Sequence, residues 1–204
     1  MNSMYLAYMS YWFLSPGMGL LTYCMGLDLN EFLSWKSPSL DLSCGNGSFT
    51  FIALGGRFHP STDYAITDYR ISSPASIRID LGIDAVPQPL EAAEKLDFYH
   101  RLIVHDCNRL PFPAENGYFN TIYCNALYWY QHPNQFLREV YRILAPGGEA
   151  LFHVMTPKFC EPYDLLRKYF DPEMIDFIDR FKRSRETLNQ PYIEKATNSG
   201  DNPF

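Results

Sequence analysis

The sequence predicts an α/β protein built on a mostly parallel sheet with helices on both faces. Short apolar runs alternate with amphipathic segments over residues 38–154, a pattern typical of strand–helix–strand units. The first apolar run, Leu40-Asp41-Leu42, is soon followed by the glycine turn Gly45-Asn46-Gly47. Such a turn lets backbone approach a ligand where a Cβ atom would collide. A chain of 204 residues is long enough for one domain with short appendages.

The expected elements divide the chain into three parts. Residues 1–37 form a lead with a helix over 20–35, residues 38–157 form the core, and residues 158–204 hold one or two helices and a polar tail. The expected core elements are strands at 38–42, 77–83, 102–104, 118–125 and 149–154, and helices at 48–54, 87–98 and 133–144. We expect Pro146-Gly147-Gly148 to end the last of these helices. Residues 55–76, rich in Gly, Ser, Pro, Asp and Tyr, are expected to be an inserted loop, over the substrate mouth or elsewhere on the surface.

The composition excludes several classes of function. A formal net charge of −6 gives little support to nucleic-acid binding through phosphate neutralisation. The five cysteines contain no C-x-x-C pair, so neither a disulfide framework nor a metal site is expected, and a cytoplasmic location is the default. No charge precedes Asp28, but Pro16-Gly17-Met18-Gly19 interrupts this apolar stretch. We therefore expect no membrane span and no signal peptide, and we interpret the lead as short helices that cover the core or a ligand mouth.

Four landmarks follow one another in the core. They are the glycine turn at 45–47, Gly82-Ile83-Asp84, Asp106 with Leu110-Pro111-Phe112, and Leu144-Ala145-Pro146-Gly147-Gly148. We expect each landmark to lie at the carboxyl end of a strand or just after it. Ligands of parallel sheets bind at that edge, so the landmarks predict a binding site there.

On these motifs the chain, from about Pro38 to Pro157, resembles the class I S-adenosylmethionine-dependent methyltransferases of the group called type 11. The resemblance implies a Rossmann-like fold, S-adenosylmethionine as cofactor, and transfer of its methyl group to an acceptor. The acidic charge favours a small-molecule acceptor over DNA or RNA.

The resemblance also implies roles for single residues. The residues predicted to bind the cofactor are Asp41, Ser43, Gly45 and Gly47 at its amino-acid end, Asp84 at the ribose hydroxyls, Asp106 at the adenine amino group, and Asn125 beside the transferred methyl group. A carboxylate suits the two ribose hydroxyls because it offers paired acceptors. Asp80 is a less favoured rival for the ribose, and Asp106 has the alternative of only capping a turn. His132 is the candidate general base, where the acceptor needs one.

The chain departs from the family pattern in several places. Ser43 stands where the family has glycine, which costs about 1 kcal/mol if the backbone there needs a positive φ. Asn120 replaces a common aspartate, and Asp84 lies 84 − 47 = 37 positions after Gly47, where about 20 is typical of dinucleotide fingerprints. No strand pair is evident after Thr156, although family members complete the sheet with an antiparallel pair.

Three explanations of the missing strands stay open. The C-terminal helices cap the edge, a homodimer pairs across it, or the chain is degenerate. These departures motivate an alternative function, a catalytically silent interaction or regulatory module. A nicotinamide-dependent oxidoreductase is a third candidate, but Thr50 stands where its fingerprint needs a third glycine.

Overall fold

A computed structural model describes residues 2–64, 68–127 and 130–153, and every structural statement below concerns these residues. Five strands form one sheet in the order β5-β4-β1-β6-β7, and every neighbouring pair is parallel. The strands are β1 (Ser39–Leu42), β4 (Ile79–Asp84), β5 (Tyr99–Val104), β6 (Phe119–Cys124) and β7 (Leu144–Phe152). The predicted α/β fold with a parallel sheet is therefore confirmed.

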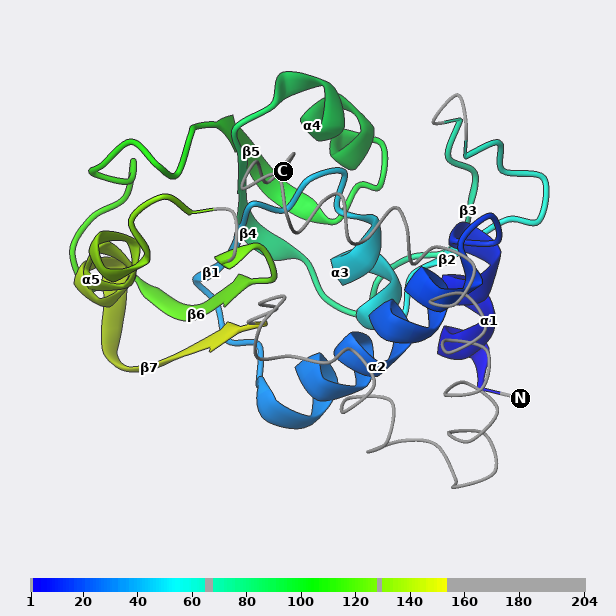
Figure 1. Cartoon of the computed structure of the whole chain (residues 1–204), viewed down its shortest axis with the longest axis horizontal. Helices are drawn as coiled ribbons and strands as arrows, with labels where there is room; N and C mark the ends of the chain where they lie inside the picture. The colour runs from blue at the N-terminus through cyan, green and yellow to red at the C-terminus, as the bar shows by residue number, and fades with distance from the viewer. Residues whose placement is uncertain (1, 65–67, 128–129, 154–204) are drawn as a thin grey trace, which may run out of the picture. The chain divides into compact units, whose positions relative to one another are not determined.

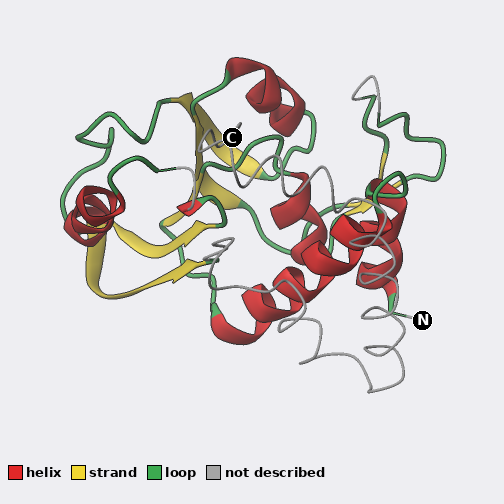
Figure 2. Ribbon diagram, viewed as in Figure 1, coloured by secondary structure: helices red, strands yellow, loops and turns green. Residues whose placement is uncertain are grey.

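Helices cover both faces of the sheet (Figures 1 and 2). They are α1 (Ser3–Tyr11), α2 (Pro16–Phe32), α3 (Ser48–Ala53), α4 (Pro87–Glu94) and α5 (Pro133–Ile143). Helix α5 packs through Phe136 on the face to which Leu40 and Leu42 point. The other face carries α3 and α4, where Phe51 and Ala93 share a buried cluster. Because strand side chains alternate between faces, Asp41 points to the side opposite α5.

The lead is helical and covers the core. Asn2 begins α1 by accepting a hydrogen bond from the backbone N–H of Met4 at 2.9 Å, and Met4 and Tyr8 bury the inner side of the helix. Helix α2 starts at Pro16, earlier than predicted, because proline is well suited to the first helical position. Within the described residues, no helix has both the length and the apolar character that a membrane crossing needs.

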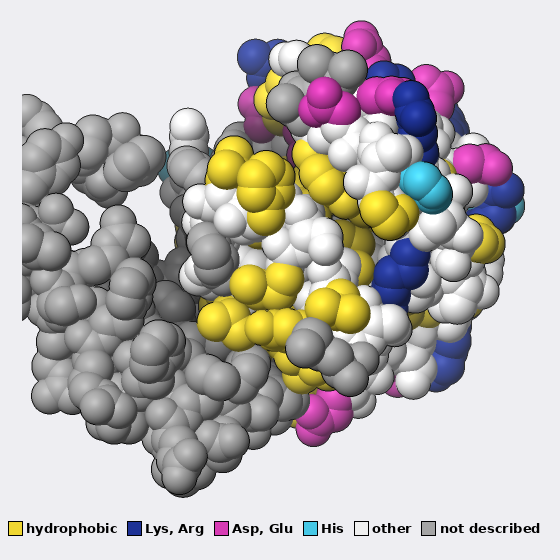
Figure 3. Space-filling view, turned by 90° about the vertical axis from the view of Figure 1, so that its right-hand side faces the viewer, with side chains coloured by type: hydrophobic (Ala, Val, Ile, Leu, Met, Phe, Trp, Pro, Cys, Tyr) yellow, Lys and Arg dark blue, Asp and Glu magenta, His cyan; other side chains and the backbone are white. Residues whose placement is uncertain are grey.

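The insertion at 55–76 contains a short antiparallel pair, β2 (Arg57–Phe58) and β3 (Ile71–Ser73), beside α1. Figure 3 shows hydrophobic side chains gathered on the face that includes α1 and this pair. Exposed large apolar residues of the lead are Leu6, Phe13, Leu14, Met18 and Phe32. The described residues of the insertion thus include a strand pair, which packs on the lead where Phe58 stacks on Tyr11.

The predicted start of the last strand at residue 149 was wrong, and so was the expected position of Pro146-Gly147-Gly148 at or after the carboxyl end of a strand. Helix α5 already ends at Ile143, and these three residues lie inside β7, near its amino end. The pairing with β6 runs from Phe119↔Leu144 to Thr121↔Glu149, so β7 advances five residues while β6 advances two. Gly147, at φ 76°, sits in this bulge. The fourth landmark therefore lies at the amino end of a strand, away from the edge that the other three share.

The predicted elements of residues 158–204 lie outside the described residues. The described part of β7 pairs with β6 on one side only.

Candidate functional site

A cavity of about 400 Å³ lies at the carboxyl ends of β1, β4, β5 and β6. Ser43 follows β1, Asp84 ends β4, Asp106 follows β5 and Asn125 follows β6, and all four line the cavity. Tyr130, from the segment that leads to α5, lines it as well. Four residues predicted from the sequence thus meet in one place, because parallel strands bring their carboxyl ends to the same edge.

Asp84 connects the glycine turn to the next loop. Its Oδ2 accepts a hydrogen bond from the backbone N–H of Gly45 at 2.9 Å, and its Oδ1 accepts one from Val86 at 3.0 Å. A carboxylate offers about four acceptor positions, so this partly exposed side chain keeps capacity for further donors.

Asp106 caps the loop that follows β5. Its Oδ1 accepts from the backbone N–H of Asn108 at 2.9 Å, so the capping role considered above is present. The side chain of Asn108 in turn accepts from the backbone N–H of Gln131 at 2.9 Å, which ties this loop to the one after β6. The Arg109 guanidinium lies 3.6 Å from Asp106, but the Arg109 side chain is 85% exposed, so this ion pair contributes little.

A buried glutamate on α5 fixes the Leu110-Pro111-Phe112 segment. Oε1 of Glu139 accepts from the backbone N–H of Phe112 at 2.7 Å, and Glu139 is also bonded to Arg142. Hydrogen bonds from Arg142 lower the pKa of Glu139. Arg142 donates to the carbonyl of Ala114 at 3.0 Å, so both side chains hold the loop that carries Asp106. Sequence reasoning missed this pair, although its three-residue spacing on one helix face is a usable signal.

The glycine turn has left-handed backbone at three positions. Ser43, Gly45 and Gly47 have φ values of 55°, 55° and 71°. The expected strain at Ser43 is therefore present. Oγ of Ser43 lies 2.6 Å from the hydroxyl of Tyr130, and the Tyr130 ring stacks on Phe136 at 3.9 Å. This Ser43–Tyr130 bridge links the end of β1 to the segment before α5.

Asp41 does not line the cavity. It is 2% exposed, and its Oδ2 accepts a hydrogen bond from the hydroxyl of Tyr99 at 2.7 Å. Burial raises the pKa of Asp41 to about 6, although hydrogen bonds from its neighbours oppose the shift. Gly47 lies directly over the same ring, since a Cβ atom added there would stand 2.9 Å from Cε2 of Tyr99. Asp41 therefore supports the turn from beneath.

Asp80 and Asn120 lie near the amino ends of β4 and β6, at the opposite end of the strands from the cavity. Asp80 accepts from the backbone N–H of Ser39 at 2.7 Å, at the start of β1. Asn120 donates to the carbonyl of Ser37 at 2.8 Å. Neither residue lines the cavity.

His132 precedes α5, is exposed, and does not line the cavity. A different histidine is enclosed at the carboxyl end of β7. His153 Nδ1 lies 3.0 Å from the hydroxyl of Tyr123, and burial lowers the pKa of His153. No sequence pattern singled out His153, because a lone histidine after a strand carries no motif. Tyr128 and Trp129, which lie between Asn125 and His132 in the sequence, are outside the described residues.

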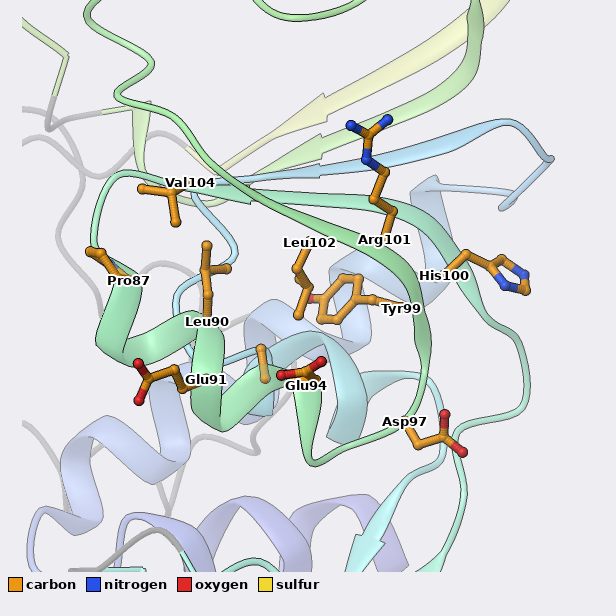
Figure 4. A pocket seen from close by; sticks show the side chains of 11 residues that line it. Pro87, Leu90, Glu91, Glu94, Asp97, Tyr99, His100, Arg101, Leu102 and Val104 are labelled. Atoms are coloured by element: carbon orange, nitrogen blue, oxygen red, sulfur yellow. The ribbon is translucent and has the colours of Figure 1, made fainter.

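A second cavity, of about 510 Å³, lies between α4 and the edge strand β5 (Figure 4). Leu90, Tyr99 and Leu102 form its apolar part, and Glu91, Glu94 and Arg101 lie around it. It contains none of the residues predicted to bind a cofactor.

Comparison with known proteins agrees with the predicted family. Residues 70–152 match the family model described as a methyltransferase domain. The matched residues make up less than half of the chain, so the match shows that this part of the chain is similar to a methyltransferase domain. No curated protein matches the sequence significantly.

Solved structures that match the chain are distant in sequence. One is a SAM-dependent methyltransferase of Thermotoga maritima, described as a possible histamine N-methyltransferase, with 18% identity, a TM-score of 0.46, and coverage of 65% of this chain and 53% of that one. Another, from Mesorhizobium loti, has 20% identity, a TM-score of 0.45, and coverage of 63% and 52%. A Haemonchus contortus phosphoethanolamine N-methyltransferase, complexed with phosphoethanolamine and S-adenosylhomocysteine, has 14% identity, a TM-score of 0.46, and coverage of 66% and 26%. The chain spans about half the length of the first two proteins and 26% of the length of the third.

Proposed function

We propose that this chain binds S-adenosylmethionine in the cavity at the carboxyl ends of β1, β4, β5 and β6, and transfers its methyl group to a small-molecule acceptor. The observation that carries the proposal is the meeting of Asp84 and Asp106, from adjacent strands, with Ser43 and Asn125 around one cavity. The match to a methyltransferase domain supports the same function.

The residues of the cavity fit an adenosyl group. Asp84 and Asp106 retain acceptor positions beyond their backbone hydrogen bonds, and ribose hydroxyls and an adenine amino group are donors that need acceptors. Val86 and Ala126 supply apolar wall beside these carboxylates, as an aromatic base requires. In this assignment Asp84 binds the ribose and Asp106 the adenine edge.

The glycine turn and Asp41 serve the amino-acid end of the cofactor. The N–H of Gly45 donates to the carboxylate of Asp84, which supports a location of the turn beside the proposed ribose position. Asp41 acts from beneath through the hydroxyl of Tyr99 and sets the electrostatic potential under the turn. When bound, S-adenosylmethionine supplies the electrophilic methyl group, and Asn125 lines the zone of transfer.

We assign His132 as the general base for those methyl acceptors that must lose a proton. Its exposed position before α5 predicts a small contribution. Methyl transfer depends mainly on alignment and water exclusion, and proton removal helps only some nucleophiles. The described lining of the cavity contains the carboxylates of Asp84 and Asp106 and no lysine or arginine, so it does not favour nucleic acid, and the acidic chain supports a small acceptor.

Isothermal titration with S-adenosylmethionine tests the proposal. We expect saturable binding by the wild-type chain, and about tenfold to hundredfold weaker binding by Asp84→Asn and by Asp106→Asn, because each loses charged hydrogen bonds. Glu94→Gln, an exposed substitution on α4, is the matched control and should bind like wild type. Equal binding by all four proteins would falsify the assignment.

A catalytically silent interaction module is the second candidate function. The Ser43–Tyr130 bridge favours it, because two side chains joined at 2.6 Å occupy the wall between the glycine turn and Asn125. Cofactor binding without turnover of a broad acceptor panel, together with a stable partner in pull-down experiments, would favour this function.

A homodimer through the edge of the sheet and a cytoplasmic location are further proposals. The described part of β7 has strand pairing on one side only, and exposed edges invite pairing. Sedimentation analysis of the full chain tests the dimer, which a monomer at micromolar concentration would contradict.

A further inference from the structure

The side chain of Asn46, in the middle of the glycine turn, is held from outside the core. Its Oδ1 accepts from the backbone N–H of Ser48 at 3.1 Å. Its Nδ2 donates to the hydroxyls of two tyrosines, Tyr11 at 2.7 Å and Tyr69 at 3.2 Å. The amide thus has a partner for each of its two hydrogens and for its oxygen.

The two tyrosines come from two segments that are not part of the parallel sheet and its connecting helices, the lead and the insertion. Tyr11 is the last residue of α1, and Tyr69 belongs to the insertion, shortly before β3. Their hydroxyl oxygens lie 3.4 Å apart. Burial is the largest cause that raises the pKa of Tyr69, so its hydroxyl stays neutral at physiological pH. The lead and the insertion therefore both reach the same residue of the turn, Asn46.

Aromatic packing fixes both rings. The Tyr11 ring stacks on Phe58 at 5.8 Å between centroids, and it contacts Trp12 at 4.3 Å and Tyr64 at 4.9 Å. The Tyr69 ring contacts Phe58 at 5.2 Å. Tyrosine side chains held in this way lose little further freedom when they form a hydrogen bond, so they can define the position of Asn46.

The same turn is held on its inner side by Asp84, which accepts from the N–H of Gly45. The backbone of residues 45–47 is therefore fixed between the proposed ribose ligand and the two tyrosine hydroxyls. Groups that orient a binding loop in this way control ligand affinity without touching the ligand.

We propose that Tyr11 and Tyr69 are positioning residues of the cofactor site. Acting through Asn46, they set the glycine turn for the amino-acid end of S-adenosylmethionine, so that the lead and the insertion are working parts of this site. The inference rests on the proposed function. It predicts that loss of either hydroxyl weakens recognition of the amino-acid end and leaves recognition of the adenosyl end unchanged.

The test compares two ligands across tyrosine-to-phenylalanine variants of the full chain. Methylthioadenosine contains the adenosyl group but lacks the amino-acid part of S-adenosylmethionine. We expect Tyr11→Phe and Tyr69→Phe each to raise the Kd for S-adenosylmethionine about threefold to tenfold, and the double variant to raise it further. The Kd for methylthioadenosine should stay within twofold. Tyr141→Phe, at an 81% exposed position on α5, is the control and should change neither Kd.

Kinetics and a second variant complete the test. In a steady-state assay with an acceptor that the wild-type protein methylates, the KM for S-adenosylmethionine should rise in the variants while kcat stays within twofold. Asn46→Ala should reproduce the selective loss seen in the double variant, because it removes the group on which both hydroxyls act.

The outcomes separate the inference from the function on which it rests. Equal S-adenosylmethionine binding by wild type and the phenylalanine variants overturns the inference alone, and so does an equal loss for both ligands. No binding of S-adenosylmethionine by the wild-type chain overturns the proposed function and the inference with it.

Discussion

The two sides of the glycine turn use carboxylates in opposite ways. On the open side, Asp84 and Asp106 lie at or after strand ends, are partly exposed, and accept from backbone N–H groups around the cavity. On the buried side, Asp41 lies inside β1, is 2% exposed, and bonds to Tyr99. The difference teaches that a carboxylate at the end of a strand is available to a ligand. A carboxylate that lies one residue further back, inside the strand, is instead buried and stabilises the protein's own structure.

This comparison makes a general prediction. Substitutions on the buried side should change the free energy of unfolding, and substitutions on the open side should change ligand affinity with little effect on stability. The four predictions below test that division, beginning with the largest expected effect.

Gly47→Ala should destabilise the protein by about 2–4 kcal/mol. Its new Cβ would stand 2.9 Å from the Tyr99 ring, at a backbone φ of 71° that L-residues disfavour. Gly45→Ala is a matched control, since its φ is 55° but no atom lies within 4 Å of the added Cβ, so about 1 kcal/mol of strain is expected. Urea unfolding measures both, and equal losses would contradict the role assigned to Tyr99.

Asp41→Asn should change how stability depends on pH. The folded-state pKa of Asp41 is raised to about 6, so the folded protein holds this proton more tightly than the unfolded chain does. Protonated Asp41 therefore contributes about 1–3 kcal/mol to the free energy of unfolding of the wild type. This contribution is fully present below about pH 4 and is lost as the pH rises through about 6. Asparagine keeps an acceptor for Tyr99 and removes the titration. Unfolding free energies at pH 4 and pH 7 measure the effect, and parallel profiles for both proteins would refute it.

Ser43→Gly should leave stability nearly unchanged. It should also strengthen cofactor binding severalfold, because it removes the Ser43–Tyr130 bridge from the cavity wall and restores the glycine that the family has at this position. Glycine relieves about 1 kcal/mol of left-handed strain but loses a hydrogen bond of similar value to Tyr130. Tyr130→Phe loses the same bond and keeps the strain, so this variant should be about 1 kcal/mol less stable. Thermal unfolding and calorimetric titration compare the two, and weaker binding by Ser43→Gly would show that the serine assists the cofactor.

His132→Ala should lower kcat by twofold to tenfold, the smallest effect of the four, because the imidazole is exposed and outside the cavity walls. Its unfolding free energy should match wild type within about 0.5 kcal/mol, as is usual for surface positions. Steady-state rates across pH 6–9 measure the effect. Unchanged turnover at every pH would remove His132 from the mechanism.

Local patterns were sufficient to locate the main elements of the described core. Apolar runs and Gly or Pro punctuation placed β1, β4, β6, α3 and α5 within a few residues. The failure at Pro146-Gly147-Gly148 has a physical reason. Such residues prevent a helix from continuing, but local sequence does not reveal that the chain then enters a strand through a bulge.

The candidate site was predictable where it depends on topology and unpredictable where it depends on packing. Ser43, Asp84, Asp106 and Asn125 meet because each follows or ends a parallel strand. The hydroxyl of Tyr130 reaches Ser43 across 87 positions of sequence, and no pattern in either segment indicates that contact. The burial of Asp41 could have been inferred, since Leu40 and Leu42 point toward α5 and alternation sends the residue between them to the other face.

The central place of β1 also has a consequence for how the chain acquires its structure during synthesis. Its backbone pairs with β4 on one side and with β6 on the other, and the register Ser39↔Thr121 joins residues 121 − 39 = 82 positions apart. The middle of the sheet therefore stays incomplete until β6 has left the ribosome. Nascent chains that stop before β6 should expose an apolar ladder, and we expect them to need chaperones and to aggregate when released.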